Sequence, residues 1–155
     1  MARRRNRNKG ATRKIRKSEG RLLRRLSEKM LDADGLVVKR DSGGGKMSEI
    51  LLDFVDPFIA DCEDIEICRN IIRLAVMVWN TSLLPQEKGK EALEKMVASF
   101  DKEAQVEGCM IIYQMLNRKM RFFSHCNRCI FDFDLIDKGS DWHLNVVSSL
   151  TTDSP

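Results

Sequence analysis

The sequence predicts an α+β protein that is mostly α, with a compact bundle of four to five helices and a C-terminal two-stranded β-hairpin. Three observations predict this class. The longest uncharged run, residues 74–86, lies inside an apolar segment of helical length. Apolar residues recur at helical spacing on both sides of that segment. The pattern then changes to alternation between about residues 129 and 148, as in paired strands.

A long central helix is predicted for Asp64–Pro85, with Asp64 as its N-cap and Pro85 marking its end. Its apolar residues cover more than one face, which predicts a core helix surrounded by others. Arg69 and Arg73 interrupt the apolar run, so it does not qualify as a membrane span of about 20 apolar residues. Its β-branched residues leave a buried strand as an alternative, but its length favours a helix.

A helix is predicted before the central one, over Ser48–Asp61, and its first residue is a good N-cap. Apolar residues form a stripe along one side of it. Pro57 lies inside this pattern. Because proline lacks an N–H and its ring collides with the preceding turn, we expect Pro57 to kink or split the helix.

Two helices are predicted after the central one, Gln86–Phe100 and Lys102–Met120, with Asp101 as the cap of the second. Gly108, in the middle of the second helix, predicts a close approach by another helix. The apolar residues of this helix predict a wide apolar face: Val106, Cys109, Met110, Ile112, Tyr113, Met115 and Leu116.

The predicted hairpin pairs Cys129–Asp137 with Trp142–Ser148 through a turn at residues 138–141. Its parity places Phe133 and Leu135 on the side of Leu144 and Val146. The opposite face is predicted to be solvated, and it carries Asp132, Asp134, His143 and Asn145. Two carboxylates and an imidazole are capable of acid–base chemistry, but an exposed hairpin face favours a solvated surface. Open strand edges favour a homodimer through the hairpin edge, and a helical face is the alternative interface.

Charge divides the chain into two parts. Residues 1–46 carry 16 Lys and Arg against 5 Asp and Glu, a net charge of +11. Residues 47–155 carry 11 against 18, a net charge of −7. We therefore predict a basic, largely disordered arm over 1–46, with one amphipathic helix at about 18–33 and a Gly-rich linker, and an acidic globular domain over 47–155.

The first 17 residues contain no acidic residue and only one large aliphatic side chain after Met1, Ile15. Such a segment buries too little apolar surface to fold alone. Its arginines suit phosphate, and counterion release would make binding independent of sequence and sensitive to salt. Alternatives are a solvated tail, a mitochondrial transit peptide, an extension from an upstream start codon, and an arm that folds back on the acidic body. The predicted nucleic-acid contacts are Arg3, Arg4, Arg5, Arg7, Lys9, Arg13, Lys14, Arg16 and Lys17.

The helix predicted at Ser18–Ala33 is amphipathic. Its apolar side consists of Leu22, Leu23, Leu26, Met30 and Leu31. Its other side is mostly basic, with Arg21, Arg24, Arg25 and Lys29. This pattern is typical of an element that binds a membrane surface or a partner helix, or of one whose leucines cover the core. The following DSGGGK sequence is not a phosphate-binding loop, because Arg40 and Met47 occupy positions that the motif requires to be Gly and Ser or Thr.

The five cysteines are an odd number, and no secretory signal precedes them. We therefore expect reduced thiols and a cytoplasmic protein. Cys126 and Cys129 have the C-x-x-C spacing of a zinc knuckle, for which His125 and His143 would supply further ligands and Cys109 a more distant one. No second C-x-x-C exists, and Cys129 is in phase with the apolar face of the strand, so a place in the core is the alternative.

No catalytic motif appears, and the sequence does not disclose an activity. Three function hypotheses follow. The first is a non-enzymatic protein whose arm contacts nucleic acid while its body dimerises or docks a protein. The second is an interaction or structural module whose arm is incidental. The third is a small zinc-binding protein using Cys126 and Cys129.

Overall fold

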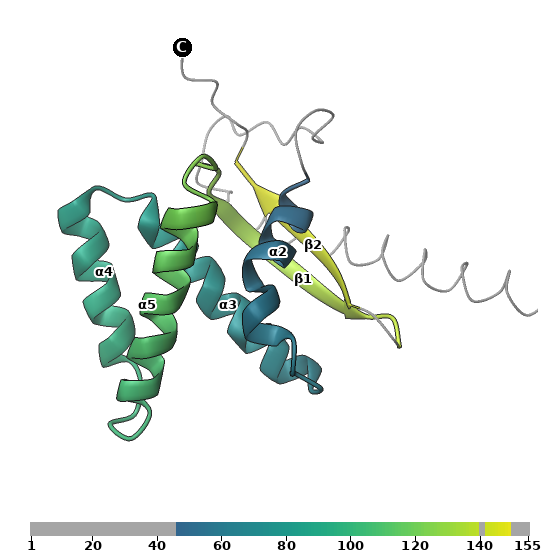
Figure 1. The fold of residues 1–155 in the computed structure, drawn as a ribbon, viewed down its shortest axis with the longest axis horizontal. Coiled ribbons are helices and arrows are strands. Elements are labelled where there is room, and N and C mark those ends of the chain that lie inside the picture. The colour runs from purple at the N-terminus through teal and green to yellow at the C-terminus, as the bar shows by residue number, and fades with distance from the viewer. Residues whose placement is uncertain (1–45, 140–141, 150–155) are drawn as a thin grey trace, which may run out of the picture. The chain divides into compact units, whose positions relative to one another are not determined.

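The computed structural model describes residues 46–139 and 142–149. The arm and the helix predicted at 18–33 lie outside these residues. The predicted fold class is confirmed: within the described residues, four helices are followed by a two-stranded antiparallel hairpin. Figure 1 shows the arrangement of these elements. The elements are α2 (Met47–Ile59), α3 (Ile65–Ser82), α4 (Gln86–Ala98), α5 (Gln105–Phe122), β1 (Ile130–Asp137) and β2 (Trp142–Ser148).

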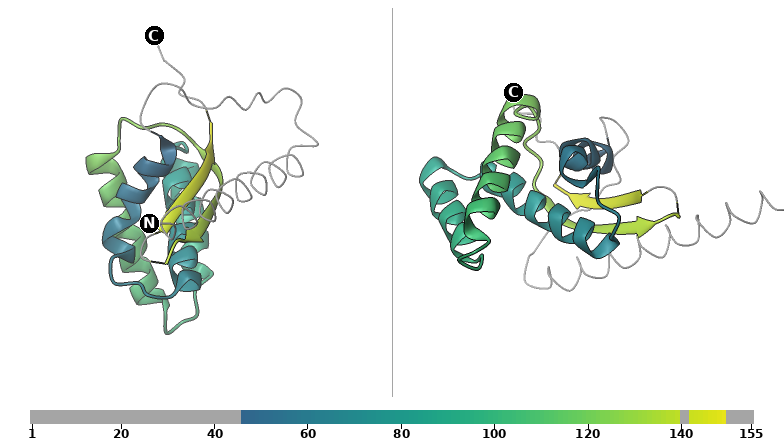
Figure 2. Two further views of the ribbon diagram at one scale, coloured as in Figure 1. Left: turned by 90° about the vertical axis from the view of Figure 1, so that its right-hand side faces the viewer. Right: turned by 60° about the horizontal axis from the view of Figure 1, so that its bottom comes forward.

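The described residues divide into two compact units, with boundaries after Leu52 inside α2 and after Ile130 at the start of β1. The unit of residues 53–130 contains α3, α4 and α5, which pack pairwise against one another (Figures 1 and 2). α3 buries one side in this packing, with Cys68, Ile72, Ala75, Val78 and Trp79. Ile67 and Met77 are exposed, so the prediction that α3 is surrounded on all sides is wrong.

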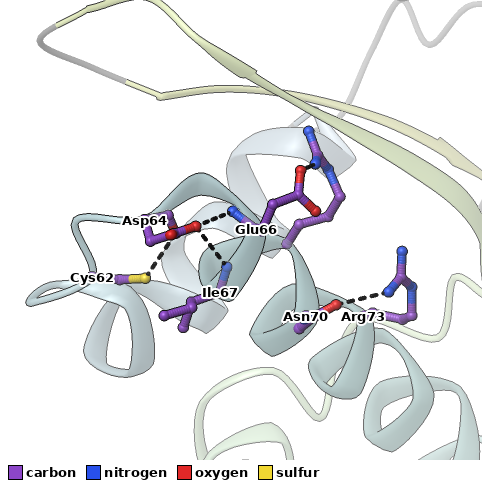
Figure 3. Close-up of polar contacts among 7 residues, drawn as sticks. Cys62, Asp64, Glu66, Ile67, Asn70 and Arg73 are labelled. Atoms are coloured by element: carbon purple, nitrogen blue, oxygen red, sulfur yellow. Dashed lines mark hydrogen bonds and ion pairs between the residues drawn. The ribbon is translucent and has the colours of Figure 1, made fainter.

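Asp64 is the N-cap of α3, as predicted. Its Oδ1 accepts hydrogen bonds from the backbone N–H groups of Glu66 (2.7 Å) and Ile67 (3.3 Å), as Figure 3 shows. Two of the four unpaired donors at the start of the helix are thereby satisfied. Further along, Arg73 donates to Asn70 Oδ1 at 2.9 Å, a contact on the exposed side of the helix.

Pro57 does not split α2, which runs without a break from Met47 to Ile59. A proline at position 57 deprives the carbonyl of Asp53, four residues earlier, of its helical donor. Arg118 of α5 replaces that donor: its Nη2 donates to Asp53 O at 2.9 Å and its Nε to Phe54 O at 3.1 Å. The guanidinium therefore satisfies the backbone where the proline leaves a gap and ties α5 to α2.

α5 begins later than predicted, because Ala104 and not Asp101 is its N-cap. Asp101 instead accepts a hydrogen bond through its backbone carbonyl, from the N–H of Ala104 at 2.9 Å. The close approach predicted at Gly108 is present, but the neighbour is an aromatic ring and not a helix. A Cβ at this position would lie 2.9 Å from a carbon of the Phe100 ring, so a larger residue would require the ring or the helix to shift.

The second unit contains the hairpin, whose two strands lie side by side in both views of Figure 2. Its turn uses Gly139 at φ +94°, a conformation that favours glycine, and Gly139 N–H donates to Asp137 Oδ1 at 2.7 Å. Leu135 and Ile136 are both buried although consecutive strand residues face opposite sides. Both faces of β1 are therefore covered in part.

The polar face predicted for the hairpin is present but is not fully solvated. All four of its members are half-buried: Asp132, Asp134, His143 and Asn145. Their environment is therefore intermediate between a solvated surface and a core, which corrects the prediction.

Candidate functional site

A buried lysine near the C-terminus of α5 organises the segment that follows the helix. Lys119 is 2% exposed, and its Nζ donates to Phe123 O (2.8 Å) and Cys126 O (3.0 Å). The same Nζ lies 4.3 Å from the centre of the Trp79 ring, a cation–π distance. An ammonium has three N–H donors, so two carbonyls and one aromatic face account for all three directions. Burial lowers the pKa of Lys119.

Trp79 also binds this segment. Its Nε1 donates to Arg128 O at 2.8 Å, and its side chain is fully buried. Its ring meets that of Phe54 edge-on, with centroids 5.2 Å apart, and that of Phe123 at 5.9 Å. Trp79 is therefore a core aromatic and also a donor that fixes a loop.

Asn80 fixes the point where this loop becomes β1. Its Nδ2 donates to Ile130 O at 2.7 Å, and its Oδ1 accepts from Ile130 N–H at 2.9 Å. The carboxamide thus pairs with the first residue of β1 as a backbone peptide group of a neighbouring strand would. Trp79, Asn80 and Lys119 together hold residues 123–130, and we call them the loop anchors.

The C-x-x-C segment lies within the anchored loop, and the structure gives no support for a zinc site there. The Cys129 thiol lies 3.5 Å from Asn80 Oδ1, and burial raises its pKa, which disfavours the thiolate that a metal requires. Cys126 is buried and His125 is exposed, while His143 lies on β2 with its Nε2 3.0 Å from Asn145 Oδ1. No cluster of three or more His, Cys, Asp or Glu side chains suited to a metal occurs within residues 46–139 and 142–149.

Sequence reasoning missed Lys119 and Asn80 as structural residues. A signal for the lysine exists: Gly108, Ile112, Met115 and Lys119 are spaced four, three and four residues apart, so Lys119 continues the buried stripe of α5. No such signal exists for Asn80, because its partner lies 50 residues further along the chain.

The wide apolar face predicted for α5 divides into a buried part and an exposed part. Ile112 and Met115 are buried, 1% and 0% exposed, among the packed helices. Val106, Met110 and Tyr113 are 69%, 58% and 62% exposed and recur at spacings of four and three residues. We call these three residues the outer stripe. Isolated exposed apolar residues are common, but an aligned row of three is a candidate for an interaction surface.

The outer stripe forms one wall of a groove between α4 and α5, with a volume of about 560 Å³. The residues lining this α4–α5 groove are Val97, Gln105, Val106, Cys109, Met110, Tyr113 and Gln114. Two exposed carboxylates, Glu103 and Glu107, lie at the N-terminal end of α5 near this row. An apolar groove with acidic residues at one end is suited to the apolar face of a helix that carries cations.

The nine predicted nucleic-acid contacts of the arm lie outside the described residues. Within them, none of the helices combines the length and apolar character required to cross a membrane. Comparisons with protein-family models, with curated proteins and with solved structures found no match for this chain. The functional argument therefore depends on the residues of this chain alone.

Proposed function

We propose that this chain is a non-enzymatic nucleic-acid-binding protein whose affinity for phosphate resides in the arm. The observation that carries this proposal is the separation of charge, +11 over residues 1–46 and −7 over residues 47–155. The proposed contacts are Arg3, Arg4, Arg5, Arg7, Lys9, Arg13, Lys14, Arg16 and Lys17. Planar guanidinium groups bind phosphate oxygens in pairs, and each contact releases counterions from the nucleic acid.

The cations of the body support this assignment because many of them are engaged within the protein. Arg118 donates to two backbone carbonyls, and Lys119 and Arg128 are buried. Arg69 pairs with Glu66, and Lys95 pairs with Glu91 at 2.9 Å. An acidic body whose cations are engaged in this way repels a polyanion, so the arm must supply the attraction.

Fluorescence anisotropy with a labelled RNA strand of about 20 nucleotides tests the proposal, using the full chain between about 50 and 200 mM salt. A variant with all nine arm cations replaced by glutamine should bind at least about 100-fold more weakly. The slope of log affinity against log salt concentration should also become shallower by about 0.7 for each lost phosphate contact. A matched variant with the arm arginines replaced by lysine keeps the charge and should retain most of the affinity. Equal binding by the glutamine variant would contradict the proposal.

A second candidate function is a protein-interaction module whose arm is incidental, and the α4–α5 groove favours it. Under this hypothesis nucleic acid would not bind at moderate salt, and a protein partner would copurify from both nuclease-treated and untreated lysate. Met110→Glu should abolish that copurification, whereas Lys90→Glu, at an exposed residue of α4 outside the groove lining, should not. Loss of all partners on nuclease treatment would favour the first function.

A further inference from the structure

We propose that the α4–α5 groove binds the chain's own segment Ser18–Ala33, docked as an amphipathic helix within the same molecule. This inference rests on the second candidate function, that the groove is a docking surface, and it names the occupant. Four properties support the assignment: the spacing of the apolar residues, the charge around them, the length of the linker and the high local concentration of a tethered segment.

The apolar spacing of the segment matches that of the groove. The outer stripe extends from Val106 to Tyr113, seven residues of α5 or about 10 Å. Leu22, Leu26 and Met30 recur every four residues and extend over about 12 Å when helical. Two helical rows of similar length can interdigitate along the groove, as in other complexes of a helix in a groove.

Charge favours one orientation of the segment. Asp101, Glu103 and Glu107 flank Val106, the first residue of the outer stripe, in the sequence, and Lys102 is the one cation within residues 101–107. The segment carries Arg21, Arg24 and Arg25 in its N-terminal half, and further cations precede it in the arm. Exposed ion pairs contribute only about 0.2–1 kcal/mol each, so the apolar contact supplies the affinity and the charges supply the orientation.

The linker is long enough for the segment to reach the groove. Thirteen residues separate Ala33 from Met47, and they extend over as much as about 45 Å. Met47 lies about 9 Å along α2 from Asp53, whose carbonyl accepts from Arg118 of α5. Met110 lies about 12 Å along α5 from Arg118. The extended linker is longer than these two helical distances taken together.

Tethering makes a modest contact sufficient. A segment held by a short flexible linker experiences an effective concentration in the millimolar range, which exceeds that of a second copy in a dilute solution. The chain's own segment is thus favoured over the same segment of another copy. A hairpin-edge dimer, predicted from the sequence, is not required for this docking.

Photocross-linking of the purified, nuclease-treated full chain tests this inference. A benzophenone amino acid replaces Tyr113 in the outer stripe, and a control chain carries it at Lys90, exposed on α4 outside the groove lining. We expect the probe at position 113 to form cross-links that map to residues 22–31 and that migrate as a monomer on a denaturing gel. The probe at position 90 should give few cross-links to that segment.

Variants of the segment provide a second readout. Leu22→Gln combined with Leu26→Gln should lower the yield of cross-links from position 113 at least fivefold. The matched pair Ser18→Gln and Ser27→Gln should leave the yield unchanged. Far-ultraviolet circular dichroism verifies that each variant keeps the helical content of the parent.

The remaining outcomes separate the inference from the functions on which it depends. Cross-links from position 113 to a second copy, which migrate as a dimer, would overturn intramolecular docking and leave the groove as a docking surface. An absence of cross-links would overturn both. Neither result bears on nucleic-acid binding, which the anisotropy measurement determines separately.

Discussion

The two apolar faces of α5 differ in exposure: one is buried and the other faces solvent. The inner face packs Ile112 and Met115 among the helices and ends at Lys119, whose amine is saturated by two carbonyls and a ring. The outer face presents Val106, Met110 and Tyr113 to solvent beside a groove. Hydrophobicity on a helix therefore does not identify the core face. The inner face is distinguished by a glycine at a close approach and by a lysine whose amine contacts two carbonyls and a ring.

The largest difference between the faces should appear on truncation to alanine. Ile112→Ala removes a buried side chain and should lower the free energy of unfolding by about 3 kcal/mol. Met110→Ala, on the outer stripe, should change it by less than about 0.5 kcal/mol. Urea denaturation followed by tryptophan fluorescence measures both. Equal losses would show that the outer stripe is also part of the core.

Lys119→Met tests whether the inner face depends on its charged group. The substitution keeps the length of the side chain but leaves the carbonyls of Phe123 and Cys126 without their donor, so we expect a loss of about 2 kcal/mol. The exposed Lys90→Met is the matched control and should be nearly neutral. If Lys119→Met is as stable as the parent, burying the ammonium costs as much as its contacts return.

Gly108→Ala has two opposing effects on stability, a gain in helix propensity and a loss from crowding against the Phe100 ring. Alanine is favoured over glycine by about 1 kcal/mol inside a helix. The new methyl group, however, would meet three carbons of the Phe100 ring at 2.9–3.1 Å. We expect the packing to dominate and the variant to be less stable by about 1 kcal/mol. The double variant Gly108→Ala with Phe100→Leu should recover part of the loss, and a stabilised single variant would contradict the close contact.

The smallest effect concerns pH. Burial lowers the pKa of Lys119 below its ordinary value of 10.5, so the native protein releases this proton at a lower pH than the unfolded chain does. Between those two pKa values the unfolded chain binds more protons, and stability must rise with pH. The stability of the parent relative to Lys119→Met should therefore increase as the pH approaches 10.5. A difference that stays constant over this range would show that the pKa of Lys119 is not lowered.

Local patterns were sufficient to predict the elements of the fold, because each depends on neighbouring residues. The N-cap at Asp64 and the hairpin from Ile130 to Ser148 follow from spacing and turn residues. The continuity of α2 through Pro57 did not follow, since the compensating donor, Arg118, lies 61 residues away. The division of α5 into a buried and an exposed face was also missed, because it depends on which side of α5 packs against the other helices.

Little of the candidate site was predictable from sequence. The C-x-x-C spacing drew attention to residues 126–129, yet the contacts that organise this loop come from Trp79, Asn80 and Lys119 on two helices. The groove combines Val97 of α4 with α5, a pairing that no sequence spacing discloses. The arm stays a prediction from composition, because residues 1–45 lie outside the part of the chain that the structure describes.

The hydrogen bonds from Arg118 to α2 have an evolutionary consequence. The guanidinium donates to the carbonyl of Asp53 because Pro57 cannot. A substitution that restored an amide at position 57 would create a second donor for the same oxygen and weaken selection for arginine at position 118. In related sequences the two positions should therefore change together, with arginine retained where proline is present. The side chain at position 53 should vary freely, because only its backbone takes part.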